Sequence, residues 1–215
     1  MNGLRLWLAP LALCVLAACA QEPPPLDPAP EPIGAFRMGF PIVVANDAQK
    51  GPASREATED ELAAAVEAAV TERLDRYDGD GLYHVGLRVE AYVLAQPGIP
   101  VIFSPQSVML LALNVWDNAT QERLNEEPIR ITAFEGGQGG GPFVPSGLIN
   151  SREKQLANLA RTAARQVEVE LRKRADDWFV LPDDHERVAF DRTLRDRSTG
   201  DTDAEASAQE AASGN

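Results

Sequence analysis

Alternation of hydrophobic and polar residues along the middle of the chain predicts most of a β-sheet. Over residues 83–95, apolar side chains fill every second position, which is the period of a strand with one buried face. Residues 107–117 are apolar on both faces, which indicates a strand in a central position of the sheet. Pro41 marks an irregularity or an edge position in the first strand. The predicted strands are residues 36–45, residues 83–95, residues 107–117, and a fourth that contains Ile129, Ile131 and Ala133 and could begin near Leu124.

Apolar residues at helical spacing predict two helices. Thr58 followed by Glu61 has the pattern of a capping box, and a stripe extends from there to near Tyr77: Leu62, Val66, Ala69, Val70 and Leu74. Asn150 and Glu153 have the pattern of a second capping box and predict the start of a longer helix. Trp178 and Phe179 follow this helix as an apolar anchor. Its stripe is Leu156, Leu159, Ala160, Ala163, Val167, Leu171 and Ala175. The order β-α-β-β-β-α predicts an α+β fold, with two helices on one face of a mainly antiparallel sheet.

Composition separates both ends of the 215-residue chain from this domain. Residues 21–32 contain six prolines, so we expect a semi-rigid tether over residues 19–34. Residues 196–215 have no aromatic or large aliphatic side chain and carry five acids against one arginine. Such a segment cannot bury enough apolar area to offset its ordering entropy. We therefore expect a domain over residues 35–190 and a disordered acidic tail over residues 191–215.

Charge and cysteine content exclude several classes of protein. The net charge of −13 and the isoelectric point of about 4.6 argue against a nucleic-acid partner. Two cysteines and two histidines exclude a disulfide-dense scaffold and a cysteine-rich zinc fold.

The first eighteen residues have the pattern of a signal peptide. Arg5 precedes a short apolar run over residues 6–15, which is about half the length that a bilayer-spanning helix needs. The run leads into Leu16-Ala17-Ala18-Cys19, which resembles the lipobox of bacterial lipoproteins. The alternative is an ordinary secretory signal in which Cys19 is incidental.

The lipobox resemblance implies a covalent membrane anchor. Residues 1–18 would be removed, and Cys19 would receive the lipid, with palmitate among the usual three acyl chains. Cys14 would be lost with the signal, which leaves no free thiol for catalysis or a disulfide. Ala20, rather than Asp, follows the cysteine. By the sorting rule of Gram-negative lipoproteins, this implies the periplasmic face of the outer membrane.

A second resemblance covers residues 146–179. This stretch is similar to the end of an uncharacterised alphaproteobacterial lipoprotein family. In that family, a glycine-rich loop precedes a Gln-Leu-x-Asn-Leu helix that ends in Trp-Phe. The element order also resembles small α+β outer-membrane lipoproteins, including those of lipopolysaccharide assembly and lipid transport. Architecture of this kind implies no particular activity.

Motifs for metal, phosphate or nucleophile chemistry are weak. In a calcium loop built around Asp78-Gly79-Asp80-Gly81, the first and last ligand positions would be Arg76 and Leu87, so a helix stop and a turn fit better. Residues 135–147 lack the spacing of a phosphate loop. The acids beside His185 predict a solvated turn, and His84 a surface position. We expect no metal, no cofactor and no catalytic residues.

Basic residues on the last predicted helix form a local basic stripe in an acidic chain. Arg161, Arg165 and Arg172 fall on one side, away from the apolar stripe. They are either a solvated face or a contact surface for an anionic lipid or protein.

These observations favour a non-catalytic, lipid-anchored periplasmic protein with a binding or accessory role in the cell envelope. The alternative is an auxiliary subunit of a lipid or lipopolysaccharide transport complex, which would contact its partner through the sheet or the basic helix. A third hypothesis is an envelope hydrolase that uses scattered carboxylates.

Overall fold

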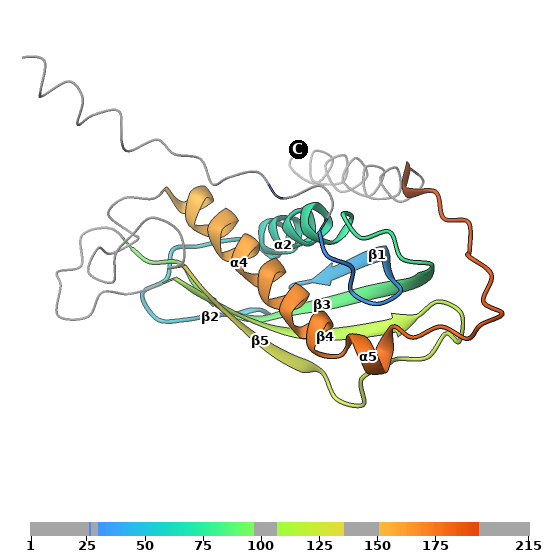
Figure 1. Ribbon diagram of the computed structural model, residues 1–215. Helices are drawn as coiled ribbons and strands as arrows, with labels where there is room; N and C mark the ends of the chain where they lie inside the picture. The colour runs from blue at the N-terminus through green and yellow to red at the C-terminus, as the bar shows by residue number, and fades with distance from the viewer. Residues whose placement is uncertain (1–25, 27–29, 97–106, 136–150, 194–215) are drawn as a thin grey trace, which may run out of the picture.

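A five-stranded sheet with two helices on one face forms the body of the protein in the computed structural model (Figure 1). The structure describes residues 26, 30–96, 107–135 and 151–193. The elements in chain order are β1 (Phe36–Val44), β2 (Gln49–Lys50), α2 (Glu59–Leu74), β3 (Gly81–Val93), β4 (Val108–Asp117), β5 (Ile129–Phe134), α4 (Arg152–Lys173) and α5 (Ala175–Trp178). This confirms the predicted α+β class.

The sheet has the order β1-β3-β4-β5, with antiparallel pairing of β3 with β4 and of β4 with β5. β1 pairs parallel to β3, because α2 carries the chain back across the sheet between them. The register of β1 shifts between Met38 and Pro41, which confirms the irregularity predicted there. β2 pairs parallel with β3 beyond the end of β1, at Ala91 and Tyr92, and therefore extends the same edge.

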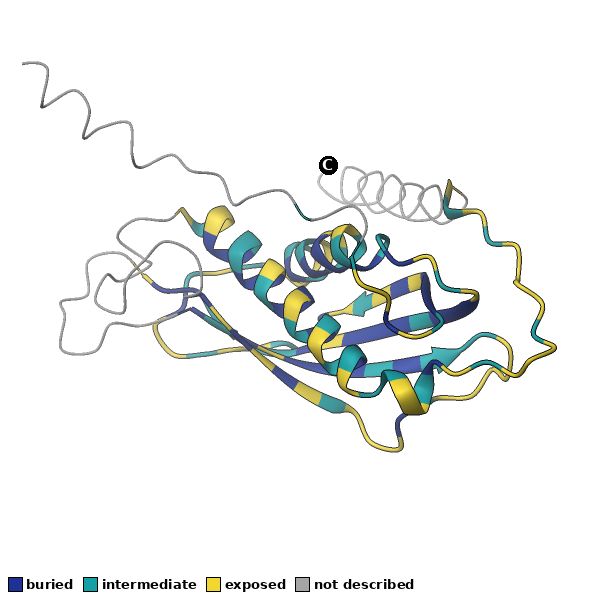
Figure 2. Ribbon diagram, viewed as in Figure 1, coloured by how far each residue is buried: buried dark blue, intermediate teal, exposed yellow. Residues whose placement is uncertain are grey.

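Both long helices pack on the same face of the sheet, α2 over β1 and α4 over β4 and β5 (Figures 1 and 2). α2 begins at the predicted capping box, in which Thr58 and Glu61 bond each other's backbone N–H. Its predicted apolar stripe is buried, and so is that of α4 as far as Leu171. None of the helices that the structure describes is long and apolar enough to cross a membrane.

The start of α4 differs from the prediction by one residue. Ser151, not Asn150, is the N-cap, and its hydroxyl accepts the backbone N–H of Lys154 at 3.2 Å. Both residue types cap helices well, so the sequence pattern does not distinguish the two positions. Asn150 lies outside the described residues.

Aromatic side chains close the core at the end where the chain enters the domain. The ring of Phe36 lies 5.9 Å from that of Tyr83 and 5.0 Å from that of Phe179. The predicted anchor is thus confirmed for Phe179, which is buried, while Trp178 is half-buried. Ile33, which was assigned to the tether, is also buried, so the packed domain begins before residue 35.

After α5 the chain continues as an irregular segment, which we call the strap (residues 180–193). It passes the ends of β1 and β3 near the connection from α2 to β3 (Figure 1). Arg192 of the strap donates to the carbonyl of Tyr77 at 3.2 Å. The packed chain therefore extends past residue 190, where the sequence placed the boundary of the tail.

Candidate functional site

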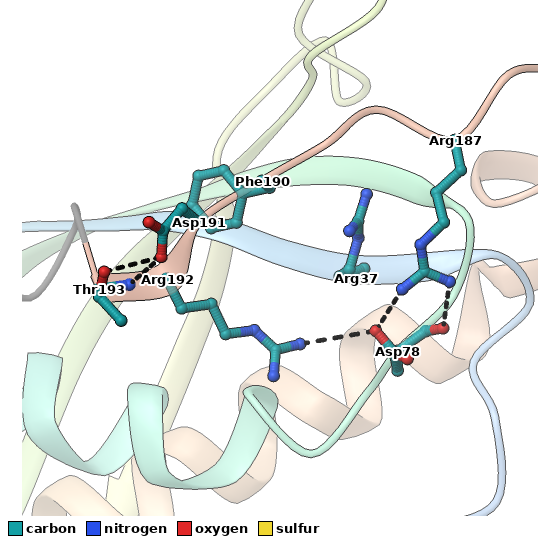
Figure 3. Close-up of a pocket in the computed structure, with 7 residues that line it drawn as sticks. All are labelled: Arg37, Asp78, Arg187, Phe190, Asp191, Arg192 and Thr193. Atoms are coloured by element: carbon teal, nitrogen blue, oxygen red, sulfur yellow. Dashed lines mark hydrogen bonds and ion pairs between the residues drawn. The ribbon is translucent and has the colours of Figure 1, made fainter.

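A cavity of about 320 Å³ lies between the strap, β1 and the connection from α2 to β3 (Figure 3). Three of its lining residues are arginines and two are aspartates, with one aromatic and one hydroxyl side chain. The lining residues are Arg37, Asp78, Arg187, Phe190, Asp191, Arg192 and Thr193. A cavity of this size is at the small end of the range for ligand sites.

Arg37 is the buried cation of the cavity. It follows Phe36 on β1, and alternation places its side chain on the sheet face opposite the helices, where the residue is only 5% exposed. One terminal nitrogen donates to the carbonyl of Val188 at 2.7 Å, while Nε has no hydrogen-bond partner among the described residues. Burial lowers the pKa of Arg37, and repulsion from Arg187 and Arg192 lowers it further. The guanidinium nevertheless stays charged, because its ordinary pKa is very high.

Asp78 holds the two strap arginines toward the connection from α2 to β3. Arg187 donates to Asp78 at 2.6 Å and to Asp80 at 3.0 Å, and these bonds raise the pKa of Arg187. The guanidinium of Arg192 lies 3.9 Å from the same oxygen of Asp78, and its hydrogen bond goes to the carbonyl of Tyr77. The predicted turn at Asp78-Gly79-Asp80-Gly81 therefore has a second role, because its carboxylates fasten the strap.

Aromatic packing fixes the strap on the other side of the cavity. The ring of Phe190 lies 5.4 Å from that of Phe40, which stacks in turn on His84 at 5.6 Å. Nδ1 of His84 accepts the backbone N–H of Phe40 at 3.0 Å, so the proton of the neutral ring is on Nε2, which donates to Asn118 at 3.0 Å. His84 is thus part of the structure that supports the strap.

A second polar cluster is buried at the opposite end of the sheet. The Ser107 hydroxyl donates to Glu135 at 2.6 Å and accepts the backbone N–H of Ala95 at 3.1 Å. Asn158 donates to the other oxygen of Glu135, and Gln155 donates to the carbonyl of Ala95. A serine that donates to a carboxylate and accepts a backbone amide is held in place, and no histidine in the described part of the chain joins it as a base.

The sheet face opposite the helices is apolar over much of its area. Five large hydrophobic side chains are exposed on its strands: Phe40, Ile42, Val44, Leu110 and Phe134. A shallow pocket of about 160 Å³ lies at the β2 end of the same face, where Val93, Val108 and Leu110 meet. Exposed apolar area of this kind is typical of interaction surfaces.

The structure divides the basic surface predicted on α4. Arg161 and Arg165 are exposed, whereas Arg172 is half-buried and bonded within the domain. Arg172 donates to the hydroxyl of Tyr77 and to the carbonyl of Glu31, both at 3.0 Å. Arg172 therefore joins the last turns of α4 to the N-terminal segment that contains Glu31.

Other predicted features fall outside the described residues or carry no site. Cys19, the glycine-rich loop and the tail beyond residue 193 are not among the described residues. His185 lies within 3.3 Å of the carbonyl of Asp80 and so helps to hold the strap. In residues 30–96, 107–135 and 151–193, no group of three or more histidine, cysteine or acidic side chains is placed to hold a metal ion.

Comparison with known proteins adds little. The sequence matches no protein-family model, and no curated protein matches it at a significant level. Solved structures that are similar include a proposed lipoprotein from Caulobacter crescentus, with 13% identity, a TM-score of 0.33, and coverage of 61% of this chain and 92% of that one. A minor lipoprotein from Acinetobacter baumannii has 13% identity, a TM-score of 0.27, and coverage of 65% and 91%. A hypothetical protein from Chlamydia trachomatis has 7% identity, a TM-score of 0.37, and coverage of 66% and 98%. Likeness at this level carries no argument about function.

Proposed function

We propose that the chain is a lipid-anchored, non-catalytic binding protein of the cell envelope, and that its ligand enters the cavity beneath the strap. The observation that carries the proposal is the buried side chain of Arg37, which lines the cavity and whose Nε has no hydrogen-bond partner in the described chain. Native proteins rarely leave a buried charged group without all its partners, so the burial of Arg37 at this cavity is consistent with a site for an anionic ligand.

Binding, rather than catalysis, is what these side chains do well. Guanidiniums orient and neutralise anions, but they do not exchange protons near neutral pH, since their ordinary pKa lies far above neutrality. Asp78 is bonded to Arg187, and Thr193 bonds Asp191 within its own turn. The cavity thus offers charge complementarity and shape, without a nucleophile held against a base.

The membrane anchor is proposed from the sequence. Leu16-Ala17-Ala18-Cys19 would direct acylation of Cys19, and Ala20 would direct the protein to the periplasmic face of the outer membrane. Several acyl chains give stable attachment, because each buried methylene contributes about 0.8 kcal/mol. A Cys19→Ala variant should fail to incorporate labelled palmitate and should leave the membrane fraction. Normal retention of the unacylated variant would overturn this part of the proposal.

Site-directed photocrosslinking in cells tests the binding function. A photoreactive amino acid at Thr193, an exposed residue of the cavity, should give a reproducible adduct in the membrane fraction. The same amino acid at Lys154, exposed at the far end of α4, is the matched control. Equal yields at the two positions, or no adduct at Thr193, would contradict ligand binding in the cavity.

The alternative function is that of an auxiliary subunit in a lipid or lipopolysaccharide transport complex. It is favoured by the exposed pair Arg161 and Arg165 and by the apolar sheet face. Replacing both arginines by Glu should then abolish copurification with an envelope complex and leave the unfolding curve unchanged. Unaltered copurification would exclude the helix as the contact surface.

A further inference from the structure

We infer that the cavity beneath the strap binds a phosphate monoester group, which Arg37, Arg187 and Arg192 hold from three directions. This inference deepens the proposed function and rests on it, because it names the chemical class of the ligand. The three arginines come from β1 and from two places on the strap, and Figure 3 shows their side chains around one hollow.

Positive charge prevails in this hollow although the chain as a whole carries −13. Three guanidiniums line it against two carboxylates. Asp191 is turned toward its own loop, where one of its oxygens accepts from the backbone N–H of Thr193 at 2.9 Å and from its hydroxyl at 2.8 Å (Figure 3). Asp78, together with Asp80 beside the cavity, pairs with the arginines, and these two carboxylates offset two of the three positive charges.

Arg37 adds a buried positive charge to the wall of the cavity, and its Nε has no acceptor in the described part of the protein. The residue is 5% exposed, and the atom has neither a protein partner nor contact with bulk solvent. A charged donor without a partner is costly to keep buried. An anionic group inside the cavity would offset this buried charge and relieve the repulsion between Arg37 and its two neighbours.

A phosphate monoester fits the arrangement better than a carboxylate does. A carboxylate is planar and matches one guanidinium fork. Asp78 already fills that role between Arg187, at 2.6 Å, and Arg192, at 3.9 Å. A phosphate monoester presents three acceptor oxygens and about −1.5 to −2 charges at pH 7, so it can engage three separate guanidiniums and compete with Asp78. Arg192 lies 3.9 Å from Asp78 and donates to the carbonyl of Tyr77 at 3.2 Å, so a phosphate would compete with both acceptors for it.

The organic part of the ligand would lie against Phe190 and Thr193, which complete the wall. A cavity of about 320 Å³ accepts a small head group and leaves a longer chain outside. The phosphate could therefore belong to a membrane lipid or to a soluble ester. Two probes separate these sources: glycerol 3-phosphate, and phosphatidylcholine vesicles that contain phosphatidic acid.

The experiment uses the full chain carrying Cys19→Ala, so that its own acyl chains do not attach it to vesicles. Calorimetry with glycerol 3-phosphate and flotation with the vesicles are compared for the parent, Arg192→Gln, Arg37→Gln and Asp78→Asn. Arg130→Gln removes an exposed arginine of β5 outside the cavity and is the matched control. Arg192→Gln should weaken binding about tenfold, the scale of one lost charge-assisted bond. Asp78→Asn should strengthen binding, and Arg130→Gln should leave it unchanged.

Each outcome bears on the inference. Binding of both probes, weakened by Arg192→Gln, supports a phosphate site open to the membrane, and binding of glycerol 3-phosphate alone supports a soluble ester. Three results would overturn the inference. They are no binding of either probe, an equal loss of binding in Arg192→Gln and Arg130→Gln, and acetate binding as strong as that of glycerol 3-phosphate. Arg37 also donates to the carbonyl of Val188 and so holds the strap in place. If Arg37→Gln unfolds the protein for this reason, the result for Arg192→Gln decides whether the inference holds. Crosslinking at Thr193 that persists without phosphate binding would retain the proposed function and reject this inference.

Discussion

Glu168 of α4 is the counterion for three arginines at the contact between the two long helices, and we predict that Glu168→Gln destabilises the domain. Its carboxylate lies 2.6 Å from Arg73 and 3.4 Å from Arg76, both near the C-terminal end of α2, and 3.6 Å from Arg172. It also accepts the hydroxyl of Tyr77. The substitution keeps the shape of the side chain and removes its charge.

The size of the effect follows from burial. The side chains of Glu168 and Arg76 are each 13% exposed, and that of Arg73 is 17% exposed, so water can replace the lost counterion only in part. Removing one partner of a fully buried pair costs about 3–5 kcal/mol. Partial exposure favours the lower end, so we expect a loss of about 3 kcal/mol in the free energy of unfolding. For a domain of this size, the midpoint of thermal unfolding should fall by roughly 6–12 °C.

The pH dependence gives the prediction a second readout. Burial acts to raise the pKa of Glu168, but the hydrogen bonds from Tyr77 and Arg73 outweigh it and hold the pKa below its usual value. Stability from the ionised carboxylate is therefore present above the pKa of the unfolded chain, about 4.5, and is lost as the pH falls through the lower folded value. Urea unfolding of the parent and of Glu168→Gln should differ most above pH 5 and converge in acid.

An exposed acid on α2 provides the control for this measurement. Glu72→Gln removes the same charge from a solvated position and should change stability little. A loss below about 1 kcal/mol in Glu168→Gln, or a loss that is the same at pH 7 and in acid, would refute the account of Glu168 as a counterion.

Three further changes test other contacts. The hydrogen bonds from Arg152 and from the backbone of Thr58 lower the pKa of Glu61 to about 2, so the stability lost in Arg152→Gln should be full at pH 7 and should shrink as the pH falls from 4.5 through 2 in urea unfolding. The loss should stay near 0.5–1 kcal/mol, because the Glu61 side chain is 39% exposed. Gly79→Ala would place Cβ 2.2 Å from the carbonyl oxygen of Ala35, and thermal unfolding should show a loss of roughly 1–3 kcal/mol. Ser151→Ala removes the cap of α4 and should cost about 1 kcal/mol in the same assay.

Periodicity identified the elements that bury one continuous face. The alternation in β3 and the stripes of α2 and α4 report burial directly, since a residue that faces the core must be apolar. β2 left no such signal, because both of its residues are exposed and its pairing uses only backbone groups. The parallel placement of β1 could not be read either, because strand direction depends on how the chain crosses the sheet.

The cavity could not be assembled from the sequence, because its parts are distant in the chain. Arg37 and Val188 are joined by a hydrogen bond across 151 positions. Two local signals were present: an arginine inside the apolar first strand, and an isolated Phe190 between Arg187 and Arg192 in a polar segment. Each signal shows that a residue has a partner somewhere, and neither shows which one. Composition placed the start of the tail at residue 191, among the residues that line the cavity.

The position of the cavity also bears on its proposed anchor and ligand. The backbone N–H of Gly79, beside Asp78, donates to the carbonyl of Phe36, so the arginine cluster lies at the end of the domain where the chain enters. About fourteen residues separate Cys19 from the first buried residue, Ile33, and a chain of that length spans at most roughly 50 Å when fully extended. A protein acylated at Cys19 would therefore keep this end of the domain within roughly 50 Å of the lipid surface. The anchor would then hold the cavity near any lipid that carries a phosphate monoester, which raises the effective concentration of that group at the site.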